Sequence, residues 1–323
     1  MNTVKIGLLG LGNVGTGTYK ILDMNREQIT KSTGLNFEVG KVLVRDINRK
    51  RDIDVALEKL TQNPDEIFND PEINVVVEVL GGIEPATTFM LEAMKNKKSV
   101  VTANKAAVAA NFKKLSEAAK ENGVEFRYEA SVGGGIPIIN AITTVLQGNE
   151  FVEVQGIVNG TTNYILTQMT DFGLDYADVL KKAQELGFAE ADPTADVEGI
   201  DVANKLSILM SIMFDEYVAP DDIPTTGISG ITPEDIEKAK AENSKIKLIA
   251  YARKDENGFE YSVKPMTLDN SHPLAGVSNE FNAVYVTGNA VGELMFYGRG
   301  AGPLPTGSAV VGDILEIGKK MYK

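Results

Sequence analysis

The chain has 323 residues, of which 43% are hydrophobic and 24% charged, a length and composition that suit about two globular domains with substantial cores. Its net charge of −13 argues against a protein that binds the phosphate backbone of nucleic acids. The lack of cysteine excludes disulfides, thiolate metal sites, iron–sulfur clusters and cysteine nucleophiles. His272, the single histidine, lies in a loop-like stretch and is expected at the surface. Acid–base chemistry therefore falls to Lys, Asp, Glu or Tyr.

Targeting and membrane signals are not evident. The N-terminus runs directly into a short apolar stretch interrupted by glycines, which is too short for the apolar region of a signal peptide. No stretch reaches the roughly 18 uninterrupted apolar residues of a membrane span. We therefore expect a cytoplasmic protein without a membrane partner.

Short apolar runs alternate with helix-like segments through the first part of the chain. Strands are predicted at residues 4–9, 37–44, 73–80, 99–102 and 124–128, and helices at 13–30, 51–60, 85–95 and 112–121. This alternation is typical of a parallel sheet with helices on both faces. The pattern predicts an α/β fold with a Rossmann-type doubly wound sheet.

The pattern changes after the glycines at 133–135. Strands are predicted at 151–158, 246–252, 260–266, 281–286 and 293–297, and helices at 161–171, 176–186, 197–214, 233–243 and 305–321, with a loop at 221–230. Thr232 is the expected N-cap of the helix at 233–243. We expect a doubly wound domain at 1–135, completed by 300–323, and an α+β domain at 136–299. The glycine motif and the resemblance given below imply nucleotide binding for the first domain, and catalysis and dimerisation for the second.

A glycine-rich turn joins the first strand to the first helix. Gly10, Gly12 and Gly15 have the G-x-G-x-x-G spacing, in which the glycines permit a tight turn, close approach of a pyrophosphate and close helix–strand packing. The N–H groups at the helix start would receive the phosphate. The expected cofactor-binding positions therefore include Asn13 and Val14 as well.

The end of the second strand bears on the choice of cofactor. An acidic residue there would accept a hydrogen bond from the ribose of NAD, but the strand ends at Arg45, with Asp46 next and Arg49 shortly after. Arg45 and Arg49 are placed to pair with a 2′-phosphate, which favours NADP. A solvated basic helix start is the alternative interpretation, and Asp46 leaves NAD possible.

Two lysines have apolar neighbours. Lys105 follows a predicted strand at the edge where open α/β sheets bind ligands. Lys205 lies in a strongly apolar helix, and Asp201, four residues earlier, shares its face. A surface ion pair is the ordinary interpretation of that spacing, but the apolar surroundings speak against a solvated position.

These residues belong to blocks that resemble one enzyme family. The blocks are TANK at 102–105, EASVGGGIP at 129–137, NGTTNYIL at 159–166 and LGFAEADP at 186–193, followed by Asp196, Gly199, Asp201, Ala203 and Lys205. In this order they resemble the signature regions of homoserine dehydrogenases. The resemblance runs from Gly10 to Gly302 and so covers nearly the whole chain.

The resemblance implies reversible reduction of L-aspartate 4-semialdehyde to L-homoserine by NAD(P)H, in threonine, methionine and isoleucine biosynthesis. Lys205 would be the proton donor, and Lys105 a second lysine of the site that also contacts the cofactor and the substrate. Glu190 and Asp201 would take part in catalysis by binding the amino-acid substrate, since carboxylates attract its ammonium group.

The resemblance also implies further ligand positions. Gly187 and Gly302 would contact the cofactor through the backbone. A monovalent cation, most simply Na⁺, would be bound by Glu129 and the carbonyl groups of Val132, Gly134 and Ile136, an all-oxygen set that suits a hard cation. The family further suggests a homodimer built through the sheet of the second domain.

The chain ends soon after the helix that follows Gly302, so we expect no C-terminal regulatory domain. Two alternatives remain at this stage. Another two-domain NAD(P) oxidoreductase, such as a sugar dehydrogenase, would usually carry Glu-Lys-Pro where this chain has Ala103-Asn104-Lys105. A non-catalytic NADP-sensing protein would not need Glu190 and Lys205.

Overall fold

In the computed structural model, residues 1–256 and 258–323 are described. The chain divides into two compact units, one formed by Met1–Gly135 together with Ala301–Lys323 and the other by Ile136–Gly300. Each unit has its own sheet.

The first unit is built on a six-stranded parallel sheet. Its strands are β1 (Thr3–Leu9), β2 (Asn36–Leu43), β3 (Leu60–Thr61), β4 (Ile73–Glu78), β5 (Ser99–Thr102) and β6 (Phe126–Arg127), in the order β3-β2-β1-β4-β5-β6. The chain order reverses between β1 and β4, which is where doubly wound sheets bind ligands, beyond the carboxyl ends of the strands. The predicted doubly wound α/β fold is confirmed.

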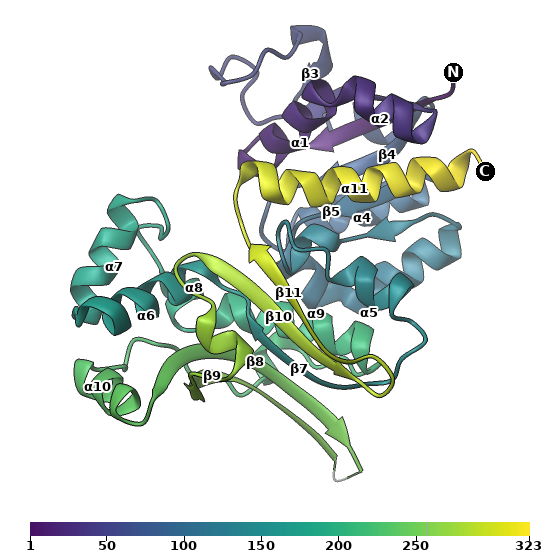
Figure 1. Cartoon of the computed structure of the whole chain (residues 1–323). Coiled ribbons are helices and arrows are strands. Elements are labelled where there is room, and N and C mark those ends of the chain that lie inside the picture. Colours follow the sequence, from purple (N-terminus) through teal and green to yellow (C-terminus); the bar gives the residue numbers. More distant parts are fainter. Residues whose placement is uncertain (257) are drawn as a thin grey trace. The chain divides into compact units, whose positions relative to one another are not determined.

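Helices cover both faces of this sheet (Figure 1). They are α1 (Asn13–Met24), α2 (Arg26–Thr33), α3 (Asp65–Phe68), α4 (Ala86–Lys95), α5 (Lys105–Asn122) and the C-terminal α11 (Pro303–Met321). Figure 1 shows α11 beside α1, with which it makes extensive contact. Gly17 permits this approach, because a side chain there would clash with the backbone of Pro303. The last segment of the chain therefore completes the fold of the first unit.

The second unit contains a five-stranded antiparallel sheet. Its strands are β7 (Phe151–Ile157), β8 (Ser244–Asp255), β9 (Gly258–Asp269), β10 (Phe281–Gly288) and β11 (Gly292–Arg299), in the order β11-β10-β7-β8-β9. Its helices are α6 (Gly160–Phe172), α7 (Tyr176–Glu185), α8 (Thr194–Val197), α9 (Ile200–Met213) and α10 (Pro233–Ala241). Thr232 caps α10 as predicted, in a reciprocal capping box with Asp235.

The structure corrects four predicted elements. The helix predicted at 51–60 is wrong, because only a 3-10 turn at Leu57–Lys59 forms before β3 pairs with the end of β2. The helix predicted at 13–30 is two helices separated at Asn25. The helix predicted at 112–121 is the second part of α5, which begins at Lys105 and is kinked at Asn111. The helix predicted at 197–214 is interrupted at Gly199, whose φ of +81° is left-handed. Long-range pairing and tight turns override the local pattern in these places.

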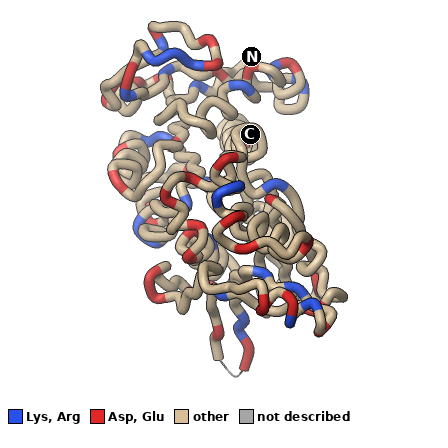
Figure 2. Tube along the Cα trace, turned by 90° about the vertical axis from the view of Figure 1, so that its left-hand side faces the viewer, with Lys and Arg blue, Asp and Glu red and all other residues tan. Residues whose placement is uncertain are grey.

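Charged residues of both signs are interspersed along the trace (Figure 2). Exposed pairs such as Lys41–Glu66, at 2.9 Å, contribute little to stability individually. Among the described helices, none is long and apolar enough to cross a membrane.

Candidate functional site

The glycine-rich turn follows β1 directly. Gly10 has a φ of +106°, and a side chain at Gly15 would clash with the carbonyl oxygen of Gly10. A Cβ at Gly12, by contrast, would meet open space. Gly12 is the N-cap of α1, whose first turn, with Asn13 and Val14, carries no acidic residue. The turn is therefore tightly packed behind and open at Gly12, with a helix N-terminus suited to an anion.

The segment after β2 exposes two arginines. Arg45 and Arg49 are both exposed. The guanidinium group of Arg51 donates to the backbone carbonyls of Asp46 and Arg49, and Gln62 donates to the carbonyl of Arg45 at 2.6 Å. The Asp46 carboxylate accepts the N–H of Asn48 at 2.8 Å. The side chains of Arg51 and Gln62 thus hold this loop through its backbone carbonyls. The carboxylate of Asp46 stabilises the turn in which it lies.

Lys105 is the first residue of α5, directly beyond the carboxyl end of β5. Asn104 is the N-cap, and its side-chain oxygen accepts the N–H of Ala107 at 3.2 Å. The amide group of Asn104 also donates to the carbonyl of Gly82 at 2.6 Å. Lys105 is half-buried. The cap therefore fixes the position of Lys105 at the carboxyl edge of the sheet, where doubly wound folds bind their ligands.

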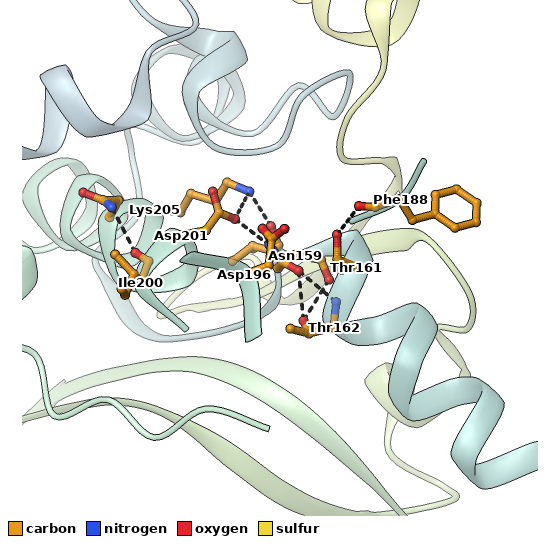
Figure 3. A network of polar contacts seen from close by, with 10 residues as sticks. Asn159, Thr161, Thr162, Phe188, Asp196, Ile200, Asp201 and Lys205 are labelled. Atoms are coloured by element: carbon orange, nitrogen blue, oxygen red, sulfur yellow. Dashed lines mark hydrogen bonds and ion pairs between the residues drawn. The ribbon is translucent and has the colours of Figure 1, made fainter. Parts of the chain in front are cut away.

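In the second unit, Lys205 and Asp201 form a buried ion pair on α9 (Figure 3). Lys205 Nζ lies 2.7 Å from Asp201 Oδ2 and donates to the carbonyl of Val158 at 2.6 Å. The two side chains are only 9% and 5% exposed. The interpretation as a solvated surface pair is therefore wrong. In this pair an ammonium group is held in one position by a carboxylate and a backbone oxygen.

Asn159, for which the sequence predicted no role, connects the parts of this network. Its amide donates to Asp201 at 2.9 Å and to Asp196 at 2.7 Å, while its side-chain oxygen accepts the N–H of Thr162 as the N-cap of α6. Figure 3 shows Asn159 between Asp196 and Thr162. An Asn-Gly-Thr-Thr run after a strand is a recognisable N-cap signal. That signal predicts the cap but not the long-range bonds to the aspartates.

Glu190 and Gly187 are on the exposed segment after α7, where Gly187 has a φ of +78°. The backbone carbonyl of Glu190 accepts a hydrogen bond from the side-chain amide of Gln184 at 3.1 Å. In the first unit, Gly302 is the N-cap of α11, with a φ of +118°.

The segment that begins at Glu129 contains a buried carboxylate. Glu129 is 6% exposed, and its N–H donates to Asp313 Oδ2 at 2.9 Å. Burial, with the negative charge of Glu129, raises the pKa of Asp313 to about 7. Val132 and Gly134 follow in the same unit and are buried, whereas Ile136 begins the other unit. Within the described ranges, no cluster of three or more His, Asp or Glu side chains suits a metal ion, so a cation here would depend on backbone oxygens.

A doubly wound unit with a phosphate-binding turn, joined in one chain to a unit with a buried lysine–aspartate pair, defines a two-domain NAD(P)-dependent oxidoreductase. Two family profiles match, "Homoserine dehydrogenase, NAD binding domain" over residues 10–129 and "Homoserine dehydrogenase" over residues 137–315. The chain belongs to the homoserine dehydrogenase family.

Individual relatives match this chain over 98–100% of its length. The homoserine dehydrogenase of Bacillus subtilis is 46% identical over 321 residues, which are 99% of this chain and 74% of that protein. A crystal structure of a homoserine dehydrogenase from Thiobacillus denitrificans has a TM-score of 0.95 and 44% identity, covering 100% of this chain and 74% of that one. A hyperthermophilic archaeal homoserine dehydrogenase in complex with NADPH has a TM-score of 0.82 and 27% identity, covering 98% of both chains.

The predicted enzyme class is therefore confirmed. The chain is an NAD(P)-dependent oxidoreductase that interconverts L-aspartate 4-semialdehyde and L-homoserine. This excludes the sugar dehydrogenase and the non-catalytic sensing protein as alternatives.

Proposed function

We propose that Lys205 is the proton donor of this reaction, and the observation that carries the proposal is its buried pair with Asp201. Hydride from NAD(P)H reaches the aldehyde carbon, so the carbonyl oxygen gains negative charge and takes a proton to become the hydroxyl of homoserine. An ammonium group can stabilise that oxygen and then supply the proton. The contacts of Lys205 with Asp201 and Val158 fix the direction in which the ammonium group points.

Substrate binding is proposed for Asp201 and Glu190, whose carboxylates would attract the ammonium group of the amino acid. Asp201 is held by Asn159 and Lys205, which gives it a defined orientation. Glu190 is exposed and can therefore reach a ligand. A loss of homoserine affinity in Glu190→Gln, without loss of NADPH affinity, tests the role of Glu190.

Lys105 is proposed as a second lysine of the reaction, because it lies at the carboxyl edge of the parallel sheet. Gly187 and Gly302 are proposed to contact the cofactor.

NADP is proposed as the preferred cofactor, bound at Gly10, Gly12 and Gly15 with its 2′-phosphate at Arg45 and Arg49. The exposure of both arginines supports this preference, as does the bond of the Asp46 carboxylate to the N–H of Asn48, which occupies Asp46 within its own loop. The NADPH complex of the archaeal relative also supports it. Arg45→Ala is expected to raise the KM for NADP about tenfold, the effect of one lost charge-assisted contact, while the KM for NAD changes little.

The control is Arg26→Ala, which removes an exposed arginine paired with Asp23 in the same unit. Equal effects of Arg45→Ala on both cofactors would contradict a 2′-phosphate contact. A wild-type preference for NAD would contradict the cofactor assignment itself.

A monovalent cation is proposed at Glu129, with the carbonyl groups of Val132, Gly134 and Ile136. The buried carboxylate of Glu129 supports it, since carboxylate and carbonyl oxygens are the ligands that hard cations prefer. Na⁺, compared with tetramethylammonium at equal ionic strength, should raise the thermal midpoint of the wild type but not of Glu129→Gln. Equal midpoints of the wild type in the two salts would contradict the site.

A homodimer is proposed through the sheet of the second unit. β11 is an edge strand of that sheet, and it exposes Met295 and Tyr297 on one face, at 43% and 53%. Apolar side chains side by side on one face are typical of a contact surface. Light scattering should give twice the monomer mass, and Met295→Glu should weaken the dimer, whereas Met24→Glu in the first unit should not. A monomeric wild type would contradict the proposal.

A further inference from the structure

A fully buried carboxylate lies at the ligand edge of the parallel sheet. Glu78 is the last residue of β4 and is 0% exposed. In the register of the sheet it is paired with Leu9 of β1 on one side and with Thr102 of β5 on the other. It therefore lies at the centre of the edge where doubly wound folds bind their ligand, and the reaction described above does not use it.

The carboxylate of Glu78 connects three pieces of backbone. Its Oε2 accepts the hydroxyl of Thr102 at 2.7 Å, and its Oε1 accepts the N–H of Leu80 at 2.7 Å. The Thr102 hydroxyl oxygen in turn accepts the N–H of Asn104 at 3.0 Å. Asn104, the N-cap of α5, donates to the carbonyl of Gly82 at 2.6 Å. The end of β4, the turn after it and the start of α5 thus form one hydrogen-bonded network.

The donor and the acceptor of each hydrogen bond in this network are fixed. A hydroxyl group has one hydrogen to donate, and Thr102 donates it to Glu78 while its oxygen accepts the N–H of Asn104. A carboxylate is the side chain that can accept from both Thr102 and Leu80 without offering a hydrogen of its own. Burial raises the pKa of Glu78, whereas its bonds from Thr102 and Leu80 lower that pKa. The polar groups at this edge therefore depend on one acceptor.

The residues after β4 that Glu78 holds in place lie against the glycine-rich turn at Gly10–Gly15. A Cβ at Gly10 would lie 3.0 Å from the carbonyl oxygen of Val79 and 3.2 Å from a methyl group of Leu80, so the glycine turn packs directly against the residues after β4. Those residues lead to Gly81 and Gly82, which are exposed and have φ values of +83° and +74°. Lys105 follows Asn104 on the other side.

We propose that Glu78 is a positioning residue for the nicotinamide cofactor: through Leu80 it fixes the turn that packs against Gly10, and through Thr102 and Asn104 it fixes the start of α5 at Lys105. The proposal rests on the proposed binding of NADP at Gly10–Gly15. It assigns Glu78 no contact with the reacting atoms. Its function is to keep the turn and the helix start in the geometry in which they receive the cofactor.

The test uses a pair of variants at Thr102. Thr102→Val keeps the shape of the side chain but removes the hydroxyl, whereas Thr102→Ser keeps the hydroxyl. Titration of NADPH fluorescence should show the Kd raised about tenfold in Thr102→Val, the effect of one unsatisfied buried group, and within about twofold of the wild type in Thr102→Ser. Glu78→Gln should match Thr102→Val, because an amide cannot accept at both atoms.

A control separates positioning from general stability. Lys98 is 4% exposed, precedes the opposite end of β5 and donates to the carbonyls of Asp70 and Ile73 at 2.6 and 2.9 Å. Lys98→Met should lower the thermal midpoint but leave the Kd of the folded protein for NADPH unchanged. In Thr102→Val the Kd for NADPH should rise even at temperatures where the protein is fully folded.

Two results would overturn the proposal: a wild-type Kd in Thr102→Val, or a Kd raised equally in Lys98→Met and Thr102→Val. Should Glu78→Gln fail to fold, the Thr102 pair decides alone. A wild-type protein that binds NADPH no more tightly than NADH would instead contradict the proposed cofactor preference, which is a distinguishable outcome.

Discussion

Lys205→Met isolates the ammonium group of the proposed proton donor. The substitution keeps most of the aliphatic stem but removes the 2.7 Å contact with Asp201 and the 2.6 Å bond to the Val158 carbonyl. A general acid contributes about 10²–10⁴ in rate, equivalent to about 3–5 kcal/mol in the activation barrier. We expect turnover with homoserine and NADP to fall by that factor, while NADPH affinity is retained.

The same change also affects stability, because it leaves Asp201 buried without the charge of Lys205. Asp201, 4% exposed, loses its cationic partner but keeps the bond from Asn159. Removing one partner of a buried pair costs about 3–5 kcal/mol, which lowers the thermal midpoint by about 10 °C for a domain of this size. The double variant Lys205→Met/Asp201→Asn removes the isolated charge. It should recover much of the stability but none of the turnover.

The assay is the homoserine-dependent reduction of NADP, followed by absorbance, at a temperature where each variant is folded. Lys182→Met, which replaces an exposed lysine of α7 in the same unit, is the matched control and should behave as the wild type. Turnover of Lys205→Met within about tenfold of the wild type, below the range of a general acid, would refute the proton-donor assignment. Recovery of turnover in the double variant would show that Lys205 acts only through stability.

Three further predictions concern single contacts. Gly12→Ala should weaken cofactor binding without loss of stability, because its Cβ meets open space, whereas Gly17→Ala should destabilise the first unit by clashing with Pro303; titration and thermal melting separate the two, and equal melting losses would contradict this reasoning. Burial lowers the pKa of Lys247 from 10.5 to about 8, so between these values the unfolded chain binds more protons and stability rises with pH. The stability of the wild type relative to Lys247→Met should therefore increase from pH 8 to about 10, and a constant difference in unfolding free energy would argue against it. Thr232→Ala removes the cap of α10 and should cost about 1 kcal/mol in denaturant unfolding; no change would mean that the capping box adds nothing.

Much of the site could be predicted from local sequence. The G-x-G-x-x-G spacing placed Gly10, Gly12 and Gly15 at one turn, because that backbone requires glycine. The i, i+4 spacing placed Asp201 beside Lys205, since a helix fixes the positions of neighbours on one face. Neither pattern showed that Val158 and Asn159 complete the surroundings of Lys205, because these residues lie between β7 and α6 and are distant in sequence.

By itself, the sequence determined most of the strands, where the chain changes from a parallel to an antiparallel pattern, and which residue types must carry the chemistry, because periodicity and composition are local properties. Tertiary structure alone decided where segments meet. It made 60–61 a strand by pairing with β2, and it divided α8 from α9 at Gly199. It also gave the net acidic, cysteine-free chain its buried Lys205–Asp201 pair and its buried Glu78. Burial depends on what packs around a residue, and this is fixed only when distant segments come together.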